Sequence, residues 1–529
     1  MRDFQKPGRS AVVTREAMAA TSHPSSTLAA IRVLEAGGNA LDAAIAACAV
    51  QCVVEPGSTG IGGDCFALLA GEDGKVHAFN GSGRAPAALT AAHLREQGLA
   101  QIPRQSPHAV TVPGAVDAWT KLHAAHGRMA FAELLAPAIR LAREGYAVSE
   151  RVQYDWGRET ALLAGDANAA RVFLPGGKPP AVGAVHRQPE LADTLEIIAR
   201  EGRDGFYRGP VAQDMVAYLN GLGGLHTLED FAQAAGEYVE PIRTTFRGHE
   251  IYECPPNGQG IVALMILNIL ARFPAKGDPL SADRLHVEIE ATRLAYAERD
   301  RHLADPVQSG VPVDHLLSDG LADALAGRIR LDRAGEPAPS LAGTEHRDTV
   351  YICVVDKDRN CASFINSIFN PYGAGLLAPR SGVLFHNRGQ SFVLAEGHPN
   401  ELAPRKRPMH TIIPGMVTKD GRPFMPFGVM GGHYQAMGHA HFISKVLDFG
   451  LEPQAAIDLP RLFPIPGTTQ IEAEDTFPAE TIAELRRRGF DIVPSGRPIG
   501  GAQAIRLDRV NGTLTGASDP RKDGCALGV

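Results

Sequence analysis

A stretch rich in proline, glycine and alanine, Arg333 to Asp348, runs directly into the strand-like segment Thr349-Val-Tyr-Ile-Cys-Val-Val. A charged turn and a second strand-like run, Cys361 to Ile368, follow. The pattern predicts a buried β-hairpin that opens with a threonine. A cut before Thr349 would expose an α-amino group, whose pKa near 7.7 to 8.0 suits it to act as base for the threonine hydroxyl. On this segment alone, the alternative is a threonine that simply opens an ordinary hairpin.

Short motifs on both sides of this junction follow one another in a fixed order. Before it stand Ala17-Met-Ala-Ala-Thr-Ser-His-Pro, Gly37-Gly-Asn-Ala-Leu-Asp-Ala-Ala, Val54-Glu-Pro-Gly-Ser-Thr-Gly-Ile-Gly-Gly, Gly205-Phe-Tyr-Arg-Gly, Gly223-Gly-Leu and Pro255-Pro-Asn-Gly-Gln-Gly. Around and after it stand Asp348-Thr-Val-Tyr, Val354-Val-Asp-Lys-Asp-Arg-Asn, Lys406-Arg-Pro, Met430-Gly-Gly and Gly516-Ala-Ser-Asp-Pro-Arg. The ordered set resembles the γ-glutamyltransferase family of N-terminal-nucleophile hydrolases over nearly the whole chain.

Composition limits the classes of partner. The 529 residues are 44% hydrophobic, enough for a large core, and the formal net charge is -7, with 52 Lys and Arg against 59 Asp and Glu. Without a basic excess, nucleic acid is not an expected partner. Seven cysteines, an odd number without a metal-type C-x-x-C, lie mostly in apolar runs, so we expect reduced core thiols.

The amino-terminal residues lack the apolar core of a signal peptide, and no later stretch reaches about 18 uninterrupted apolar residues. We therefore expect a soluble, cytoplasmic protein with no membrane partner. Many members of the family are exported or membrane-anchored, so extracellular glutathione salvage is a less expected role.

Hydrophobic periodicity predicts an α/β fold. Hydroxyl caps at 25–27 are expected to start a helix over 28–35, and an Ala-rich helix over 40–53 follows. Further helices are expected over 131–145, 191–201, 211–222, 261–271 and 281–304. Strands are expected over 66–70, 75–79, 349–355, 361–368, 411–417 and 423–429. The resemblance specifies a four-layer αββα sandwich with the nucleophile on an inner strand.

The resemblance also implies self-cleavage between Asp348 and Thr349. The products would be a large fragment of residues 1–348 and a small catalytic fragment of residues 349–529, together forming one interwoven domain. We expect the fragments to stay associated as a heterodimer, and a dimer of these heterodimers is the alternative higher state.

The catalytic roles implied by the family fall on four residues. Thr349 is the nucleophile, and its freed amine is the base. Ser367 stands where the family usually has a threonine beside the nucleophile. The backbone N–H groups of Gly431 and Gly432 are the oxyanion donors; without the resemblance, a strand-to-helix turn explains this pair equally well.

No cofactor is expected. The chain contains neither a G-x-x-x-x-G-K-[ST] phosphate loop nor an H-E-x-x-H zinc helix, and Asn80-Gly-Ser-Gly-Arg lacks the first glycine of a G-x-S-x-G elbow. His433, His439 and His441 form the one histidine cluster. Without an evident carboxylate or thiolate partner they are expected to be surface or helix-packing residues and not metal ligands.

The sequence departs from the family where γ-glutamyl substrates are held. The expected arginine is displaced by about two positions, to Arg84. The serine pair that grips the carboxylate becomes His410 and Thr411, and the asparagine after the second hydroxyl becomes Phe369.

The acidic residue that grips the substrate amine becomes Ser391, so a substrate ammonium loses its charge-assisted partner. Arg388 adds a candidate anion clamp. The segment from Phe392 to Lys406 is short for the family's lid, and an open site favours water as the acceptor. These departures resemble the branch that includes oxamate amidohydrolase and cephalosporin acylases.

The sequence therefore predicts a self-processing threonine amidohydrolase that takes a small carboxylate-bearing acyl amide and releases the acyl group mainly to water. The first alternative is γ-glutamyl transfer or glutathione hydrolysis. An inactive scaffold or binding protein is the alternative from another class.

Overall fold

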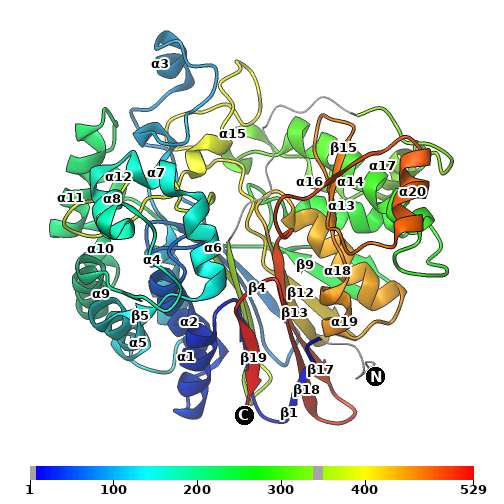
Figure 1. Cartoon of the computed structure of the whole chain (residues 1–529), viewed down its shortest axis with the longest axis horizontal. Coiled ribbons are helices and arrows are strands. Elements are labelled where there is room, and N and C mark those ends of the chain that lie inside the picture. The colour runs from blue at the N-terminus through cyan, green and yellow to red at the C-terminus, as the bar shows by residue number, and fades with distance from the viewer. Residues whose placement is uncertain (1–7, 338–348) are drawn as a thin grey trace.

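Two seven-stranded antiparallel sheets lie face to face between two layers of helices (Figure 1). The computed structural model describes residues 8–337 and 349–529. Sheet A has the order β1 (Val12–Thr14), β18 (Thr513–Ser518), β17 (Gly501–Asp508), β13 (Arg422–Met430), β12 (Gly415–Lys419), β9 (His249–Glu253) and β8 (Ile242–Phe246). Sheet B has the order β19 (Cys525–Gly528), β2 (Met18–Thr21), β10 (Val350–Val355), β11 (Cys361–Ser367), β3 (Asp64–Ala70), β4 (Val76–Gly81) and β7 (Glu237–Val239). The expected αββα sandwich is confirmed.

The strand β10 shows why the sheets pack as inner layers. All six of its residues are buried, and the run Val-Tyr-Ile-Cys-Val-Val has no polar alternation. Such a continuous apolar run suits a strand covered on both faces. Tyr351 lies in the core between the sheets with Met416 and Met430 of sheet A, whereas Ile352 belongs to the core shared with helices.

The helices divide between the outer faces. Sheet B contacts α2 (Ala40–Val54) and α4 (Ala115–His126), and α1 (Pro24–Glu35), α5 (Phe131–Glu144) and α9 (Pro189–Glu201) complete that layer. Sheet A contacts α13 (Gly260–Leu270), α18 (Gln435–Asp448) and α19 (Pro453–Asp458), with α14 (Ala282–His302) packed on α13. Every residue of α2 is buried. Its many alanines allow this because they leave room for close approach to the sheet and to neighbouring helices.

The remaining elements are peripheral or form connections. The other helices are α3 (Ala91–Glu96), α6 (Glu150–Arg158), α7 (Thr160–Ala164), α8 (Ala167–Phe173), α10 (Arg203–Tyr207), α11 (Gly209–Gly221), α12 (Leu228–Ala232), α15 (Pro306–Ser309), α16 (Val313–Leu316), α17 (Asp319–Ala326), α20 (Ala479–Arg487) and the 3₁₀ turns η1 (Pro107–Ala109), η2 (Pro175–Gly177) and η3 (Arg388–Ser391). The other strands are β5 (Tyr146–Ala147), β6 (Val185–His186), β14 (Leu462–Pro464), β15 (Gln470–Ala473) and β16 (Asp491–Pro494).

Two local predictions need correction. The N-cap of α1 is His23, whose side chain accepts from the Ser25 backbone N–H, and the hydroxyl residues predicted as caps lie inside the helix. The strand predicted over 411–417 begins only at Gly415 and runs to Lys419. The residues from 411 to 414 instead lie in the loop that carries Thr411 past the site described below.

Both sheets contain strands from either side of position 349. In sheet B, β10 lies between β2 and β11, and β11 pairs with β3. In sheet A, β12 pairs with β9. A cut before Thr349 would therefore leave two fragments joined by backbone hydrogen bonds in both sheets.

All seven cysteines are free thiols, and six of them are buried. No helix among the described residues combines the length and apolarity needed to span a membrane.

Candidate active site

Thr349 precedes β10 at one end of sheet B. Its side chain is buried, and its Oγ1 donates a hydrogen bond to the Asn366 carbonyl at 3.2 Å. The adjacent residue Val350 pairs with Asn366, so Thr349 lies beside Ser367, the last residue of β11. The predicted nucleophile and second hydroxyl are thus brought together. Asp348, the other half of the predicted cleavage site, lies outside the described residues.

Four strand ends form a row at this end of the sheet. Ser367 of β11 pairs with Asp64 of β3, and the next residue, Cys65, pairs with Gly81 of β4. Neighbouring strands lie about 4.8 Å apart. The row therefore sets the predicted nucleophile, a second hydroxyl and a buried carboxylate at successive strand positions.

The Ser367 hydroxyl is held by its own loop. Its Oγ accepts from the Phe369 backbone N–H at 2.9 Å and lies 3.5 Å from Arg388 Nη2. Phe369 has a φ of 76°, an uncommon conformation for a bulky residue. Its ring lies 4.2 Å from the Arg388 guanidinium carbon, a cation–π arrangement. The residue that replaces the family's asparagine therefore supports the arginine.

Arg388 is fully buried at the start of η3. Its Nη1 donates to Thr411 Oγ1 at 2.7 Å, and its Nε has no hydrogen-bond partner among the described residues. Burial lowers the pKa of Arg388 to about 9, with the charge of Asp64 acting in the opposite direction. The guanidinium therefore remains charged at neutral pH, although within residues 8–337 and 349–529 it has no hydrogen bond to a carboxylate.

Asp64 and two histidines form a buried cluster behind Arg388. The Asp64 Oδ1 accepts from the backbone N–H groups of Gly83 and Gly114, each at 3.0 Å, and Oδ2 lies 3.0 Å from His410 Nε2. His386 Nδ1 lies 3.7 Å from the same oxygen. Burial alone would raise the pKa of Asp64, but the two histidines and Arg388 outweigh it and bring the value to about 2.

His410 is a neutral member of this cluster. Burial is the larger cause and the positive charge of Arg388 the second; they lower the pKa of His410 to about 3. Its Nδ1 accepts from the Ile412 backbone N–H at 3.4 Å, which places the single ring proton on Nε2, toward Asp64. The side chain predicted to bind substrate is thus already bonded to a buried carboxylate.

The two glycines predicted as oxyanion donors form the turn between β13 and α18. Their φ values of 125° for Gly431 and 57° for Gly432 favour glycine over residues with a side chain. The Gly431 carbonyl accepts from the Tyr434 N–H at 3.0 Å. Because C=O and N–H point in opposite directions across a trans peptide, this bond also orients the Gly432 N–H.

The Gly432 carbonyl accepts from Gln259 Nε2 at 3.0 Å, and the same nitrogen donates to the Thr411 carbonyl at 2.9 Å. Beside it, the His433 ring lies 6.0 Å from that of Phe369. The turn, the Thr411 loop and the Phe369 loop are therefore one connected site.

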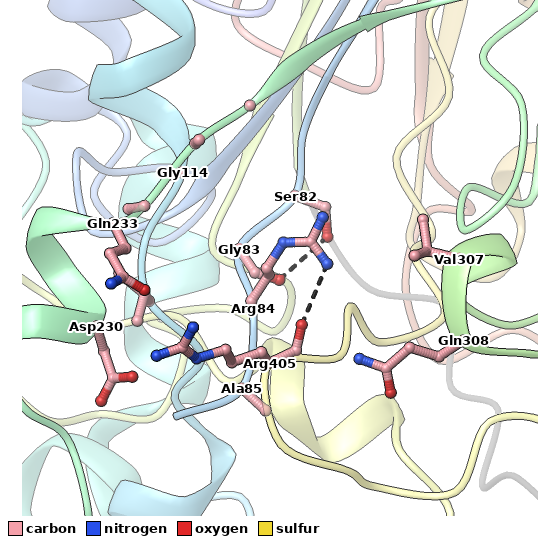
Figure 2. A pocket seen from close by; sticks show the side chains of 14 residues that line it. Ser82, Gly83, Arg84, Ala85, Gly114, Asp230, Gln233, Val307, Gln308 and Arg405 are labelled. Carbon is pink, nitrogen blue, oxygen red and sulfur yellow. Dashed lines mark hydrogen bonds between the residues drawn. The ribbon is translucent and has the colours of Figure 1, made fainter. Parts of the chain in front are cut away.

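Arg84 lies in different surroundings. Its Nη1 is 3.3 Å from Asp305 Oδ2, its Nη2 is 3.8 Å from Glu237, and it donates to the Arg405 carbonyl at 3.1 Å. Figure 2 shows it with Arg405 on the wall of a cavity of about 390 Å³. Arg84 therefore lines this cavity, and the contacts given above join it to Asp305, Glu237 and Arg405 instead of Ser367 or Arg388.

Ser391 ends the turn that Arg388 begins. Its Oγ is buried without a hydrogen-bond partner among the described residues, and its carbonyl accepts from Asn400 Nδ2 at 2.6 Å. A hydroxyl therefore stands where the family resemblance expects a carboxylate, in the same short turn as the arginine.

The clustered histidines each face a different group. His439 Nδ1 lies 2.6 Å from Glu253, His441 Nδ1 lies 3.0 Å from Glu288, and His433 Nδ1 lies 3.0 Å from Arg299 Nη1. All three are buried, so the alternative of surface positions was wrong, whereas packing of the helix layer is confirmed for His439 and His441.

Comparison with known proteins decides the family. The sequence model described as Gamma-glutamyltranspeptidase matches residues 26–529. The chain belongs to the γ-glutamyltranspeptidase family. It is 37% identical to the glutathione hydrolase-like YwrD proenzyme of Bacillus subtilis, covering 98% of this chain and 99% of that protein. It is 33% identical to the oxamate amidohydrolase proenzyme of Klebsiella pneumoniae over 98% of this chain and 99% of that protein.

A solved structure agrees with this assignment. The crystal structure of cephalosporin acylase from Bacillus halodurans matches with a TM-score of 0.93 and 39% identity, covering 100% of this chain and 98% of that one. The family resemblance found in the sequence motifs is thereby confirmed. The relatives carry the names of amide-cleaving enzymes, but the residue roles in this γ-glutamyltranspeptidase homologue rest on its own geometry.

Sequence reasoning missed three residues that shape the site: Asp64, Gln259 and Arg299. Asp64 carried a usable signal, because an acidic residue that directly follows a glycine-rich loop and opens an apolar strand calls for a specific partner. Gln259 lies within a motif that was recognised, but nothing local indicated that its side chain would bridge two distant loops.

Proposed function

We propose that this γ-glutamyltranspeptidase homologue is a self-processing amidohydrolase whose nucleophile is Thr349 and whose acyl substrates end in a carboxylate. Water is the main acceptor of the acyl group. The catalytic unit is the protein's own pair of fragments, 1–348 and 349–529. Relatives that carry the word proenzyme in their names support the processing step.

The surroundings of Arg388 are the observation from which we infer the class of substrate. A buried guanidinium with a free Nε and no bonded carboxylate among the described residues is costly in the empty protein, since its charge is desolvated without a counter-ion in contact. A substrate carboxylate would supply that counter-ion in bidentate geometry. The 3.5 Å approach of Arg388 to Ser367 Oγ places this anion site next to the proposed reaction centre.

The position of Thr349 immediately before β10 supports self-processing. The Thr349 hydroxyl attacks the Asp348 carbonyl carbon, the C–N bond to Thr349 breaks, and an ester replaces the amide. Water then hydrolyses the ester, which leaves a carboxylate on Asp348 and a free α-amino group on Thr349.

Turnover repeats the same chemistry on the substrate. The freed amine takes the proton of Thr349 Oγ1 as the oxygen attacks the amide carbonyl, and the N–H groups of Gly431 and Gly432 receive the oxyanion. Collapse returns the proton to the departing amine and leaves an acyl ester on Thr349. Water hydrolyses that ester to the free acid and restores the amine–hydroxyl pair.

The same site disfavours a free α-ammonium on the acyl group. Ser391 offers a neutral hydroxyl where a carboxylate would hold an ammonium, and the buried cation at Arg388 repels positive charge. Glutaryl-like and oxamate-like amides therefore fit better than γ-glutamyl amides.

γ-Glutamyl hydrolysis or transfer is the second candidate, favoured by similarity to proteins named glutathione hydrolases. The discriminating experiment compares kcat/KM of the purified protein for glutaryl-anilide and γ-glutamyl-anilide, which differ only by the α-amino group. We expect the glutaryl compound to be preferred. A strong preference for γ-glutamyl-anilide would replace the proposal with the second candidate.

A further inference from the structure

Gln259 is fully buried between the Thr411 loop and the turn of Gly431 and Gly432. Its Nε2 donates to the Thr411 carbonyl at 2.9 Å and to the Gly432 carbonyl at 3.0 Å. Thr411 holds the Arg388 guanidinium through its own hydroxyl. A single amide nitrogen therefore ties the loop of the anion-binding arginine to the turn of the oxyanion donors.

The orientation of this amide is set from its other end. Gln259 Oε1 accepts from Arg299 Nη1 at 3.3 Å. A guanidinium can only donate, so the oxygen must face Arg299 and both N–H groups must face the two carbonyls. The backbone N–H of Gln259 also donates to the His410 carbonyl at 2.8 Å, which anchors the residue beside the same loop.

Neighbours on α14 restrain the same turn. Arg299 Nη1 lies 3.0 Å from His433 Nδ1, and the Tyr296 hydroxyl donates to the His433 carbonyl. The Arg299 guanidinium carbon lies 4.4 Å from the Tyr296 ring. The peptide after Gly432 is therefore held at its carbonyl by Gln259, and the following residue is held by α14.

We propose that Gln259 is a positioning residue, which fixes the distance between the acyl-carboxylate site at Arg388 and the oxyanion donors of Gly431 and Gly432. This inference rests on the proposed function. An acyl chain bound at both ends requires both to be in register with Thr349, and displacement by about 1 Å in such a site can cost about 10² in rate. Gln259 makes no contribution as acid, base or nucleophile.

Two substitutions test the role. Gln259→Leu removes both donors at similar size. Gln259→Glu keeps the shape but, when ionised, presents an oxygen acceptor to two carbonyl oxygens. For cleaved enzyme acting on glutaryl-anilide, we expect both variants to lower kcat by about 10², with a smaller rise in KM.

A pH series separates positioning from general damage. In Gln259→Glu, the introduced carboxyl regains one donor when it is protonated, so the ratio of the variant's kcat to that of wild type should rise as the pH falls from 8 to 5. The ratio for Gln259→Leu should stay level. Dividing by wild type at each pH removes the titration of the Thr349 amine.

Gln188 offers a matched control, because it is a buried glutamine whose Nε2 donates to the Val53 carbonyl at 2.8 Å in the helical layer. Gln188→Leu should leave kcat within about twofold of wild type. Hydrogen exchange of the segment 431–434 should accelerate in Gln259→Leu and not in Gln188→Leu.

The outcomes are distinct. If wild type hydrolyses glutaryl-anilide but Gln259→Leu matches Gln188→Leu in kcat and in exchange of 431–434, the positioning role is overturned. If wild type fails to hydrolyse the anilide, the proposed function fails instead, and the exchange measurement alone decides whether Gln259 holds the turn.

Discussion

Arg388 and Arg84 are two arginines near the same end of sheet B, and their surroundings differ. Arg84 is partly exposed and has two carboxylate partners, Asp305 and Glu237. Arg388 is fully buried, and its hydrogen bonds go to two hydroxyls. Ion pairs with Asp305 and Glu237 hold Arg84 to the protein's own loops. Arg388 has no hydrogen bond to a carboxylate among the described residues, which favours the proposed role in binding an anionic ligand. Both residues were predicted substrate contacts, and the comparison favours Arg388.

Removing the proposed nucleophile has the largest expected effect, because a substrate bound at either Arg388 or Arg84 would need it to react. Thr349→Ala should remain a single chain and should show no turnover above background. Denaturing electrophoresis and intact-mass measurement test the first point. Efficient cleavage at 348–349 in this variant would remove Thr349 from the mechanism.

Replacing each arginine by methionine tests the comparison, and the larger effect is expected at Arg388. Arg388→Met should raise KM for glutaryl-anilide by roughly 30-fold to 5,000-fold, since a buried carboxylate left unpaired costs about 2 to 5 kcal/mol. Self-cleavage should be unchanged. The melting temperature should hold or rise, because a desolvated cation has been removed.

Displacing an oxyanion donor should slow the chemical step. Gly432 has a φ of 57°, which a β-branched residue adopts only with strain, so Gly432→Val should move the turn. We expect kcat to fall by about 10² to 10³ with a smaller change in KM. A normal kcat in stopped-flow and steady-state assays would place the oxyanion donors elsewhere.

Because His410 is buried and neutral, we expect it to make stability depend on pH, and we expect it to have no part in the reaction. The pKa of His410 falls to about 3 on folding, so below pH 6.5 the unfolded chain binds a proton that the folded chain does not, and stability falls with pH. Between pH 7.5 and 5, His410 should account for about 2 kcal/mol of lost stability.

The variant His410→Gln removes that titration, and histidines outside the Asp64 cluster keep the same surroundings in both proteins. Urea unfolding at the two pH values should show a smaller loss for the variant than for wild type. The variant should still form the acyl-enzyme; abolished acylation with intact folding and processing would point to a histidine base.

The smallest effect is expected at Arg84. Its ion pairs are partly exposed, and such pairs contribute about 1 kcal/mol or less. Arg84→Met should change kcat/KM for glutaryl-anilide by less than about threefold. A KM increase comparable to that of Arg388→Met would show that the substrate reaches the cavity of Figure 2 and would erase the contrast between the two arginines.

The sequence predicted the local features of this molecule well. The α2, α5 and α13 helices begin and end within two residues of the predicted positions, because glycine or proline close to their ends marks the limits of their apolar runs. The β10–β11 hairpin followed from two apolar runs around a charged turn. The cap of α1 was missed since a histidine side chain, a less usual cap, took the place of nearby hydroxyls.

The site was predicted where it lies in motifs, and missed where it depends on distant partners. Thr349 and Ser367 come together through one hairpin, which local pattern can reveal. The Asp64–His410 bond joins residues 346 positions apart, and Gln259 connects loops that only the packed sheets bring together. Such contacts are set by tertiary packing, so a local pattern such as the one at Asp64 can indicate that a partner exists but not which residue it is.

The most direct test of the central claim is mass spectrometry of the protein quenched during turnover of glutaryl-anilide. We predict a small fragment that begins with Thr349 and carries a glutaryl ester on that residue, lost on longer incubation in water and absent in Thr349→Ala. An uncleaved chain that turns over substrate, or a glutaryl group mapped to any other residue, would contradict the assignment of Thr349 as the nucleophile.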